Sequence, residues 1–444
     1  MWPFRQSSAH RIRSPDAYWV LRNGIGDARQ SLTKSLDCDV AVVGAGITGA
    51  LIADALVGSG ARVVMLEARD VSSGSTAATT ALLQYEIDTH LVDLVKMLGE
   101  QRALLAYRAG VDSFARLEER FPELLRLSNY RRRESLYLAE DDDAVPALRA
   151  ELAARLAIGI DCRWVDGPEL QQHFGCRRPG GILSALAAEL DPVRFTQAVV
   201  MGIERHGVPV FTRTRIRAVQ PRDERLALLT DTGHEVNAAH VVIAAGYESL
   251  DFLPRKVAKI SNTFALVTEP LAERVRVDSM PLIWESARPY LYLRGTPDGR
   301  LMIGGADLPF RNPAARDLAL SRQVTRLARD YRALFGEDLP PVSHAWGGSF
   351  AHTHDGLPYI GTVPGLHPRL QFALCFGGNG ITYSVHAAEM IRARIESRPH
   401  ALDAVFGFAR EQEDPPNARS GGDADLHPVG AQSRAGKPAR LEQR

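Results

Sequence analysis

Three glycines near the start of the chain have a spacing that lets the backbone approach a pyrophosphate. In the hexapeptide GAGITG they are Gly44, Gly46 and Gly49. The first suits a tight turn, the second leaves room for phosphate oxygens, and the third allows a helix to pack closely on a strand. A helix that begins near Ile47 and Thr48 would direct N–H groups and the positive end of its dipole at the phosphates. The motif therefore predicts a dinucleotide-binding turn.

The flanking segments predict the strands and the helix that such a turn needs. Residues 39–43 form a Val-rich run typical of a buried parallel strand, residues 47–57 have the composition of a packed helix, and residues 62–67 predict the next strand. Glu67 ends that strand, 18 positions beyond Gly49, where a carboxylate accepts hydrogen bonds from a ribose diol. Strand, turn, helix and strand together form one βαβ unit.

Two later glycine-rich segments favour FAD over NAD. Residues 74–80 (GSTAATT) carry hydroxyl groups and backbone donors that could hold phosphate or flavin, although the same composition suits a polar loop. Residues 376–381 (FGGNGI) precede a helical stretch. The positive end of that helix dipole would stabilise negative charge on a reduced flavin, and a plain helix cap is the alternative.

The composition argues against several other classes of protein. The 444 residues include 53 basic and 53 acidic side chains, so the formal net charge of +0 gives no reason to expect a nucleic acid partner. No long apolar run predicts a transmembrane helix or stable membrane insertion, and the N-terminus lacks the apolar stretch of a signal peptide. Four cysteines without CxxC spacing do not suggest a disulfide scaffold, which favours a cytoplasmic protein.

These elements predict an α/β fold, a Rossmann-like FAD-binding domain with an inserted α+β substrate domain. Periodicity predicts helices at residues 90–121, 141–157 and 318–335, and strand-like runs alternate with turns between 258 and 306. The expected layout is an irregular arm at 1–36, an FAD-binding domain at 37–89, 190–255 and 341–396, a substrate domain at 90–189 and 256–340, and a disordered tail at 410–444.

Four motifs in this order resemble those of the D-amino-acid-oxidase-like FAD enzymes, a group that includes glycine oxidase, monomeric sarcosine oxidase and γ-glutamylputrescine oxidase. They are the GAGITG turn with Glu67, AAG at 244–246, DGLPYIG at 355–361 and GGNGI at 377–381. The resemblance covers about residues 35–395. The segments GSTAATTALLQYEID and WESARPYLYLR are most similar to those of bacterial proteins of the γ-glutamylputrescine-oxidase type.

The resemblance implies a set of cofactor contacts. Glu67 would bind the adenosine ribose, the backbone of Val219 would bind adenine, and residues 378–381 would lie under the O2 edge of the flavin. Relatives that tether their flavin use a Cys or a His where this chain has Gly348 and Ala78, so noncovalent FAD is implied. The expected cofactor-binding residues are Gly44, Gly46, Ile47, Thr48, Gly49, Glu67, Ala68, Arg69, Gly74, Ser75, Thr76, Val219, Ala245, Gly246, Gly378, Asn379, Gly380, Ile381 and Thr382.

One position departs from the amino-acid oxidases of this group. Glycine-oxidase-like enzymes bind the substrate carboxylate with an Arg where this chain has Phe350. A planar, bidentate clamp for a carboxylate is therefore missing at that position. The departure counts against a simple α-amino acid as substrate, unless Arg294 or Arg288 takes over.

Five further side chains are candidates for the substrate pocket. Tyr290, Tyr292 and Arg294 would share one face of a strand, although the tyrosines could instead pack under the sheet and the arginine could lie at a solvated edge. Trp346 would wall the pocket or pack in the core. His352 could act in acid–base chemistry. No acidic ligand stands beside it at suitable spacing, so no metal site is expected.

Together these features predict an FAD-dependent oxidoreductase that oxidises a C–N bond of an amine or amino-acid-like substrate to an imine. Hydride would move from substrate carbon to flavin, and the protein would supply position and electrostatics. Molecular oxygen is the expected electron acceptor. Two alternatives stay open, a dehydrogenase that passes electrons to a quinone or carrier, and a non-catalytic flavin-binding sensor or scaffold.

Overall fold

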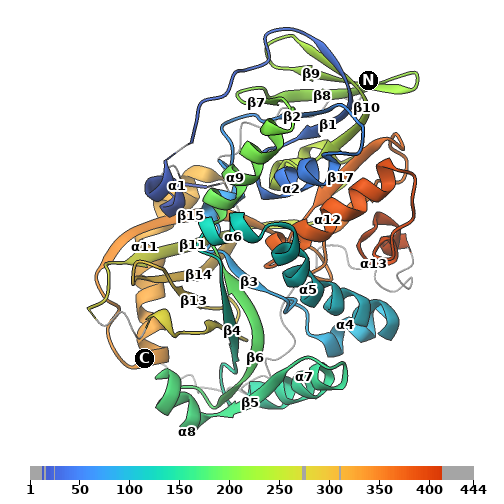
Figure 1. The fold of residues 1–444 in the computed structure, drawn as a ribbon. Helices are drawn as coiled ribbons and strands as arrows, with labels where there is room; N and C mark the ends of the chain where they lie inside the picture. Colours follow the sequence, from blue (N-terminus) through green and yellow to red (C-terminus); the bar gives the residue numbers. More distant parts are fainter. Residues whose placement is uncertain (1–12, 15–16, 25, 273–276, 310–311, 413–444) are drawn as a thin grey trace, which may run out of the picture.

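The strands of the protein form two large sheets. The computed structural model describes residues 13–14, 17–24, 26–272, 277–309 and 312–412. Figure 1 shows one sheet at the top, around β1, β2 and β10, and the other below it, around β4, β6, β11 and β14. The mixture of parallel strands, covering helices and a second sheet confirms the α/β fold expected from the sequence.

The upper, eight-stranded sheet carries the glycine-rich turn. β1 (Leu36–Val43) lies between β2 (Val63–Leu66) and β10 (Glu235–Ile243) and is parallel to both. Parallel neighbours end at the same edge, so the segments that follow these three strands meet there. The sheet continues through β17 (Leu370–Leu374), β16 (Tyr359–Thr362), β7 (Val210–Phe211), β8 (Ile216–Arg222) and β9 (Arg225–Thr230).

Three helices pack together beneath this sheet (Figure 1). α2 (Ile47–Leu56) follows the glycine-rich turn and contacts both α9 (Pro192–Arg205) and α12 (Gly380–Ile395). Their buried side chains form one apolar cluster with Val40 and Val42 of β1. Removal of this apolar surface from water stabilises the position of α2 relative to β1.

The lower, nine-stranded sheet is mainly antiparallel. Its strands run in the order β15, β11, β14, β13, β12, β4, β6 and β3, with β5 beside β6. Their bounds are β3 (Leu82–Gln84), β4 (Arg131–Leu138), β5 (Cys162–Asp166), β6 (Gly180–Glu189), β11 (Lys259–Thr268), β12 (Leu282–Glu285), β13 (Tyr292–Gly295), β14 (Leu301–Pro309) and β15 (Val342–His352).

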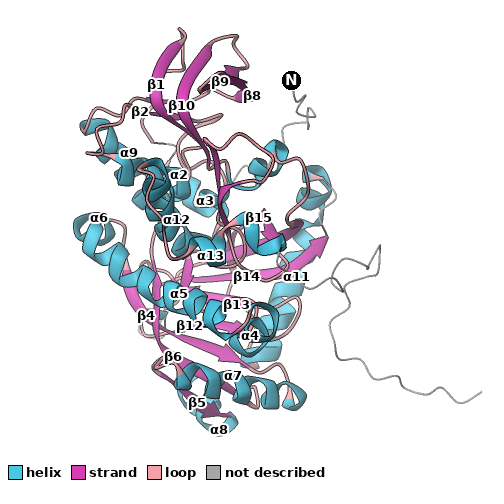
Figure 2. Ribbon diagram, turned by 90° about the vertical axis from the view of Figure 1, so that its right-hand side faces the viewer, coloured by secondary structure: helices cyan, strands magenta, loops and turns pink. Residues whose placement is uncertain are grey.

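The long helices follow the predicted periodicity, with one division. Gly99, which has a φ of 82°, separates α4 (Leu91–Leu98) from α5 (Glu100–Arg120) within the predicted 90–121 helix. Figure 2 shows α4, α5 and α7 along one side of the molecule. The other helices are α1 (Tyr18–Asn23), α3 (Ser75–Ala78), α6 (Pro122–Leu127), α7 (Val145–Ala157), α8 (Gly167–Glu169), α11 (Pro313–Phe335), α13 (Asp403–Phe406), and the short turns η1 (Asp142–Ala144), η2 (Leu170–Phe174), η3 (Gly246–Phe252) and η4 (Phe408–Gln412).

The strand pairing places two strands, β3 and β15, in a different sheet from the one that the expected domain boundaries imply. β3 falls in the predicted FAD-binding segment 37–89, but it pairs with the end of β6 and so belongs to the lower sheet. β15 falls in the predicted segment 341–396, but it pairs with β11 along nearly its whole length. Pairing with a partner distant in sequence, rather than local composition, assigns both strands to the lower sheet.

The N-terminal arm is not irregular throughout, as the sequence analysis expected. Residues 18–23 form α1, and Tyr18 and Trp19 are buried within it. The indole of Trp19 donates a hydrogen bond to the carbonyl of Thr79 at 2.7 Å. Burial of two large aromatic rings orders this part of the arm. Residues 1–12 lie outside the described residues.

The C-terminal tail also begins later than expected. Arg410 is buried, and its guanidinium donates to the two carboxylate oxygens of Asp355 at 2.8 and 3.2 Å. The same group lies 3.6 Å from the ring centroid of Tyr359. A paired charge and an aromatic face hold this residue against the upper sheet. The rest of the predicted tail, residues 413–444, lies outside the described residues.

Candidate active site

The glycine-rich turn has little room for side chains at its first and third glycines. Gly44 has a φ of 112°, and a Cβ there would lie 2.3 Å from the carbonyl oxygen of Ala244. A Cβ at Gly49 would lie 1.9 Å from the carbonyl oxygen of Gly44. Both distances are shorter than any non-bonded contact, so these glycines are required by the packing of β1, α2 and the segment after β10.

The second glycine is different because the space beside it is open. A Cβ at Gly46 would meet only the hydroxyl oxygen of Thr76, at 3.2 Å. That hydroxyl accepts a hydrogen bond from the amide of Ile47 at 3.0 Å, and the N-cap residue of α2, Gly46, has no side chain to cap the other amides of the first turn. The protein thus leaves a concave space over a helix N-terminus, which suits an anionic phosphate.

Glu67 lies at the end of β2, beside the turn. It is 7% exposed and accepts hydrogen bonds from the amides of Ala45 at 2.8 Å and Arg69 at 2.7 Å. Burial raises the pKa of its carboxyl group. An ionised carboxylate has about four acceptor sites, so each oxygen can still accept a ribose hydroxyl. Arg69 itself is held at 2.5 Å by Glu248.

The second glycine-rich segment supplies a hydroxyl group without a partner. Ser75 begins α3, and its Oγ is buried without a hydrogen bond from any described residue. It lies beside Gly246, where an added Cβ would be 3.5 Å from that Oγ, and both residues line the cavity. A buried polar group without a partner costs about 1–3 kcal/mol, and a bound cofactor oxygen would remove that cost.

The third glycine-rich segment begins α12. The side-chain amide of Asn379 donates to the carbonyl of Glu86 at 2.6 Å, and the amide of Gly378 donates to Asp88 at 3.3 Å. Gly380 and Ile381 line the cavity, whereas Thr382 is buried against the carbonyl of Asn379. The start of α12 is therefore fixed against the segment after β3, which carries Glu86 and Asp88.

One cavity connects the three segments with the lower sheet. Its volume is about 1960 Å³ with its open mouth included. At one end it reaches the glycine-rich turn, and at the other it is bounded by side chains of the lower sheet. The predicted cofactor residues that line it are Gly44, Gly46, Ile47, Thr48, Glu67, Ala68, Arg69, Gly74, Ser75, Thr76, Ala245, Gly246, Gly378, Asn379, Gly380 and Ile381.

Val219 does not line this cavity, although the sequence analysis placed it beside adenine. It is buried within β8 and pairs with Leu228 of β9. The cavity is bounded instead by Thr214, Arg215 and Ile216. These residues come where the chain enters β8, next to the end of β2, because the amide of Thr214 donates to the carbonyl of Glu67 at 2.8 Å.

Of the five candidate catalytic residues, Tyr290 and Tyr292 line the cavity and Trp346, His352 and Arg294 do not. Trp346 is buried, and its indole donates to the carbonyl of Ala78 at 2.9 Å. His352 lies behind Phe350, with ring centroids 3.9 Å apart, and it is Phe350 that lines the cavity. Phe350 and His352 are two positions apart, so alternation along β15 would place both on the same face. The strand ends at His352, however, and only Phe350 lines the cavity.

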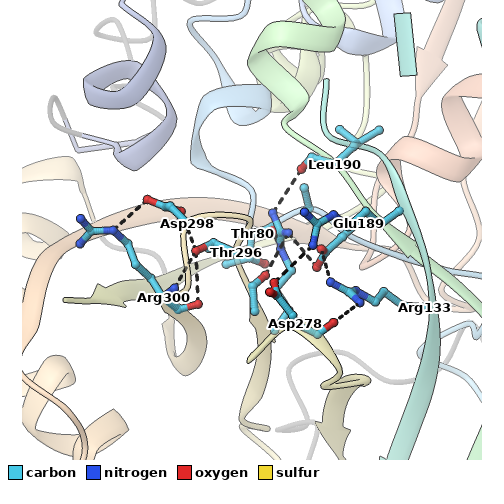
Figure 3. A network of polar contacts seen from close by, with 12 residues as sticks. Thr80, Arg133, Glu189, Leu190, Asp278, Thr296, Asp298 and Arg300 are labelled. Atoms are coloured by element: carbon cyan, nitrogen blue, oxygen red, sulfur yellow. Dashed lines mark hydrogen bonds and ion pairs between the residues drawn. The ribbon is translucent and has the colours of Figure 1, made fainter. Parts of the chain in front are cut away.

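Arg294 is a buried structural cation rather than an anion clamp. Its guanidinium contacts Glu189 at 3.1 Å and donates to the carbonyls of Thr80 at 2.6 Å and Leu190 at 3.2 Å. Figure 3 shows the network around Thr80, Glu189 and Leu190, which Arg133 extends through its ion pair with Glu189 at 2.8 Å. With these partners, Arg294 holds the cavity-lining segment in place and cannot bind a substrate carboxylate from there.

Besides Glu248 at the cradle, three acidic side chains that line the cavity toward the lower sheet were missed by the sequence analysis. They are Glu86, Asp88 and Asp307. Alternation along an extended segment could have indicated the first two. Every second residue from Thr80 to Asp88 lines the cavity, so Glu86 and Asp88 share a face with Thr80. No local pattern marks Asp307, which enters the cavity because β14 lies beside β11 and β13.

Comparison with known proteins agrees with this geometry. A family model described as "DAO: FAD dependent oxidoreductase" matches residues 39–394. The chain belongs to this family. It is thus an FAD-dependent oxidoreductase of the amine and amino-acid oxidase type, and the open cradle at Gly46 and the unpartnered hydroxyl of Ser75 fit that cofactor.

Three similar proteins are each less than a quarter identical to this chain. The chain is 23% identical over 383 residues to γ-glutamylputrescine oxidoreductase of Escherichia coli, with 84% of this chain and 87% of that protein covered. It is 21% identical to a putative Rieske 2Fe-2S iron-sulfur protein of Bacillus subtilis, with 89% and 76% covered. The fold of glycine oxidase from Geobacillus kaustophilus superimposes with a TM-score of 0.69 at 19% identity, over 84% of this chain and 98% of that one.

The described part of the chain has no helix long and apolar enough to cross a membrane.

Gly46→Val is expected to abolish retention of FAD, because the valine side chain would fill the space over the N-terminus of α2. The flavin absorbance of the purified protein measures the occupancy. Gly202→Val is the matched control, because a Cβ at that position of α9 meets nothing within 4 Å. Full flavin occupancy in the Gly46 variant would show that the turn does not bind phosphate.

Ser75→Ala is expected to weaken FAD binding by about 0.5–1.5 kcal/mol, since it removes one hydrogen bond to the cofactor. Fluorescence titration of the deflavinated protein with FAD measures this change. Ser72→Ala is the control, because the Ser72 hydroxyl is also buried without a partner among the described residues but lies outside the cavity. Equal losses in the two variants would contradict a direct contact between Ser75 and FAD.

Proposed function

We propose that this protein oxidises the carbon–nitrogen bond of an amine that lacks an α-carboxylate, with noncovalent FAD as cofactor and molecular oxygen as electron acceptor. The observation that carries the proposal is Phe350, a cavity-lining residue at the position where glycine-oxidase-like enzymes bind the substrate carboxylate. Of the two potential substitutes, Arg294 is occupied by Glu189 and three carbonyl groups, and Arg288 does not line the cavity. No basic side chain bounds the cavity on the side of the lower sheet among the described residues.

The substrate end of the cavity is aromatic as well as free of cations. Trp284, Tyr290 and Tyr292 line it, with ring centroids 6.4 Å apart for the first pair and 5.6 Å apart for the second. Tyr137 stacks behind Trp284 at 3.8 Å and fixes its plane. Such rings can hold an alkyl chain and exclude water from the carbon that reacts.

The chemistry needs few protein groups. FAD, when bound, accepts a hydride from the carbon next to the substrate nitrogen. The amine must first lose its extra proton, and the oxidised substrate is an imine that water hydrolyses to a carbonyl compound and an amine or ammonia. Oxygen then takes the two electrons and is reduced to hydrogen peroxide. The role of the described side chains is to bind and orient the amine, as in other sites where positioning lowers the barrier.

Noncovalent attachment of FAD is supported by the two positions where relatives have a tether. Gly348 and Ala78 both line the cavity, and a Cβ at Gly348 would lie 3.3 Å from the Cβ of Ala78. Neither residue has a nucleophile. Cys375 also lines the cavity, but burial raises the pKa of its thiol to about 12, so it stays protonated and unreactive.

The name of one relative supports an amine as substrate, and the free cysteines support a cytoplasmic compartment. The γ-glutamylputrescine oxidoreductase of Escherichia coli is named for a substrate with an extended amine. All four cysteines of this chain are free, which favours the cytoplasm as the compartment.

Acid precipitation of the purified protein is expected to release all of its flavin as FAD, because no side chain at Gly348 or Ala78 can form a bond to it. Chromatography of the supernatant identifies the flavin, and the colour of the washed pellet reports covalent attachment. Flavin that stays in the pellet would rule out noncovalent binding, and nicotinamide in place of flavin would rule out the cofactor itself.

Butylamine and 1,4-diaminobutane are expected to reduce the bound flavin faster than glycine, sarcosine and D-alanine. Loss of a buried charged partner typically costs about 2–5 kcal/mol, so an α-carboxylate beside Phe350 would weaken binding roughly 30-fold or more. Anaerobic mixing measures the reduction rate, and oxygen consumption with peroxide formation tests the acceptor. Faster reduction by the three amino acids would overturn the proposed substrate class.

A further inference from the structure

The charges around the cavity differ between its two ends. At the adenosine end, the only basic lining side chains in the described part of the chain, Arg69 and Arg215, lie beside Glu248 at 2.5 and 3.7 Å. At the substrate end, the lining residues include Glu86, Asp88 and Asp307, with no basic side chain among them. The ionisable side chains that line the substrate end are therefore mainly acidic rather than basic.

Glu86 is the most deeply buried of these acids. It is 3% exposed, and neither carboxylate oxygen has a hydrogen bond of normal geometry with a described residue. The nearest cation is the guanidinium of Arg155, at 3.7 Å. Burial raises the pKa of Glu86, and Arg155 and the Ser135 hydroxyl oppose this shift. A buried, incompletely paired carboxylate that lines a cavity is costly unless a ligand compensates for it.

Arg155 cannot neutralise Glu86 alone, because it already pairs with Glu151. The Nε of Arg155 donates to Glu151 at 2.8 Å, and both side chains are fully buried. Glu151 also accepts from the hydroxyl of Tyr107 at 3.0 Å. His90 lies nearby, but burial lowers its pKa and favours the neutral ring. Two buried carboxyl groups thus share one guanidinium, and a cation bound in the cavity would compensate the charge of Glu86 that Arg155 leaves incompletely paired.

A second acid with an open acceptor lies on another wall. Asp307 extends from β14, its Oδ1 is buried without a hydrogen-bond partner among the described residues, and burial raises its pKa to about 6. The nearby cations Arg288 and Arg326 do not line the cavity. Between Glu86 and Asp307 the lining is aromatic, with Trp284 and Tyr290, whose π faces attract cations.

We propose that the substrate carries a second, positively charged nitrogen besides the neutral nitrogen that reacts, and that Glu86 binds this charge through a direct ion pair in the cavity. The fitting chemical class is an aliphatic diamine or triamine without a carboxylate. The inference rests on the proposed amine oxidation, since it names the substrate class of the same site. The aromatic side chains would hold the alkyl chain between the two nitrogens.

The test compares two amines of equal chain length, 1,4-diaminobutane and butylamine, on the FAD-loaded protein. Anaerobic flavin reduction at several concentrations separates the dissociation constant from the limiting rate. The wild-type protein is expected to bind the diamine at least about 30-fold more tightly. Equal dissociation constants for the two amines would overturn the inference, whatever the variants do.

Glu86→Gln is expected to remove this preference by weakening the diamine to the level of butylamine while butylamine itself is unchanged. Glu285→Gln is the matched control, because it removes another buried carboxylate, one that pairs with Arg178 and does not line the cavity. Its diamine preference should persist. A preference retained in the Glu86 variant would contradict the ion pair, and if that variant does not fold, the wild-type comparison decides.

Calorimetric titration with the same two amines separates this inference from the proposed function. If no amine reduces the flavin but the diamine still binds in a Glu86-dependent manner, amine oxidation is wrong and the cation site stands. If amines reduce the flavin with no preference for a second charge, the cation site is wrong and amine oxidation stands.

Discussion

The contact between Gly49 and the backbone of Gly44 fixes where α2 begins relative to β1, and the position of the cofactor cradle depends on it. With a Cβ at Gly49 only 1.9 Å from the carbonyl oxygen of Gly44, any other residue would push the helix away from the strand. The parallel pairing of β1 with β2 and β10 then brings Glu67, Gly246 and the start of α2 to one sheet edge. This edge forms one end of the cavity, and residues of the lower sheet form the other end.

Three buried side chains hold the segment that joins the cradle to the substrate end. Trp346, Trp19 and Arg294 donate to the carbonyls of Ala78, Thr79 and Thr80 in turn. Two of these, Trp346 and Arg294, were candidates for substrate contact in the sequence analysis, beside a core and a surface alternative. Their actual role is to position the chain just before the alternating residues that present Gln84, Glu86 and Asp88 to the cavity. They act through the backbone and not on the ligand.

Residues whose role follows from local chain geometry were predictable, and residues placed by distant pairing were not. The positions of Gly44 and Glu67 at the edge of the upper sheet could be predicted because a strand, a tight turn, a helix and a second strand follow one another in sequence. Arg294 could not, because its partner Glu189 is on β6, more than a hundred residues earlier. The strand alternation that grouped it with Tyr292 was a sound rule, but the cavity ends before Arg294 is reached.

The central claim is that amines reduce an FAD held in this cavity by loss of hydrogen from the carbon next to nitrogen. Single-turnover reduction with 1,4-diaminobutane and with the same diamine deuterated at both of those carbons tests it most directly. The account predicts reduction by both compounds, with a markedly slower limiting rate for the deuterated one. Failure of either compound to reduce the flavin, or identical limiting rates for the two, would contradict it.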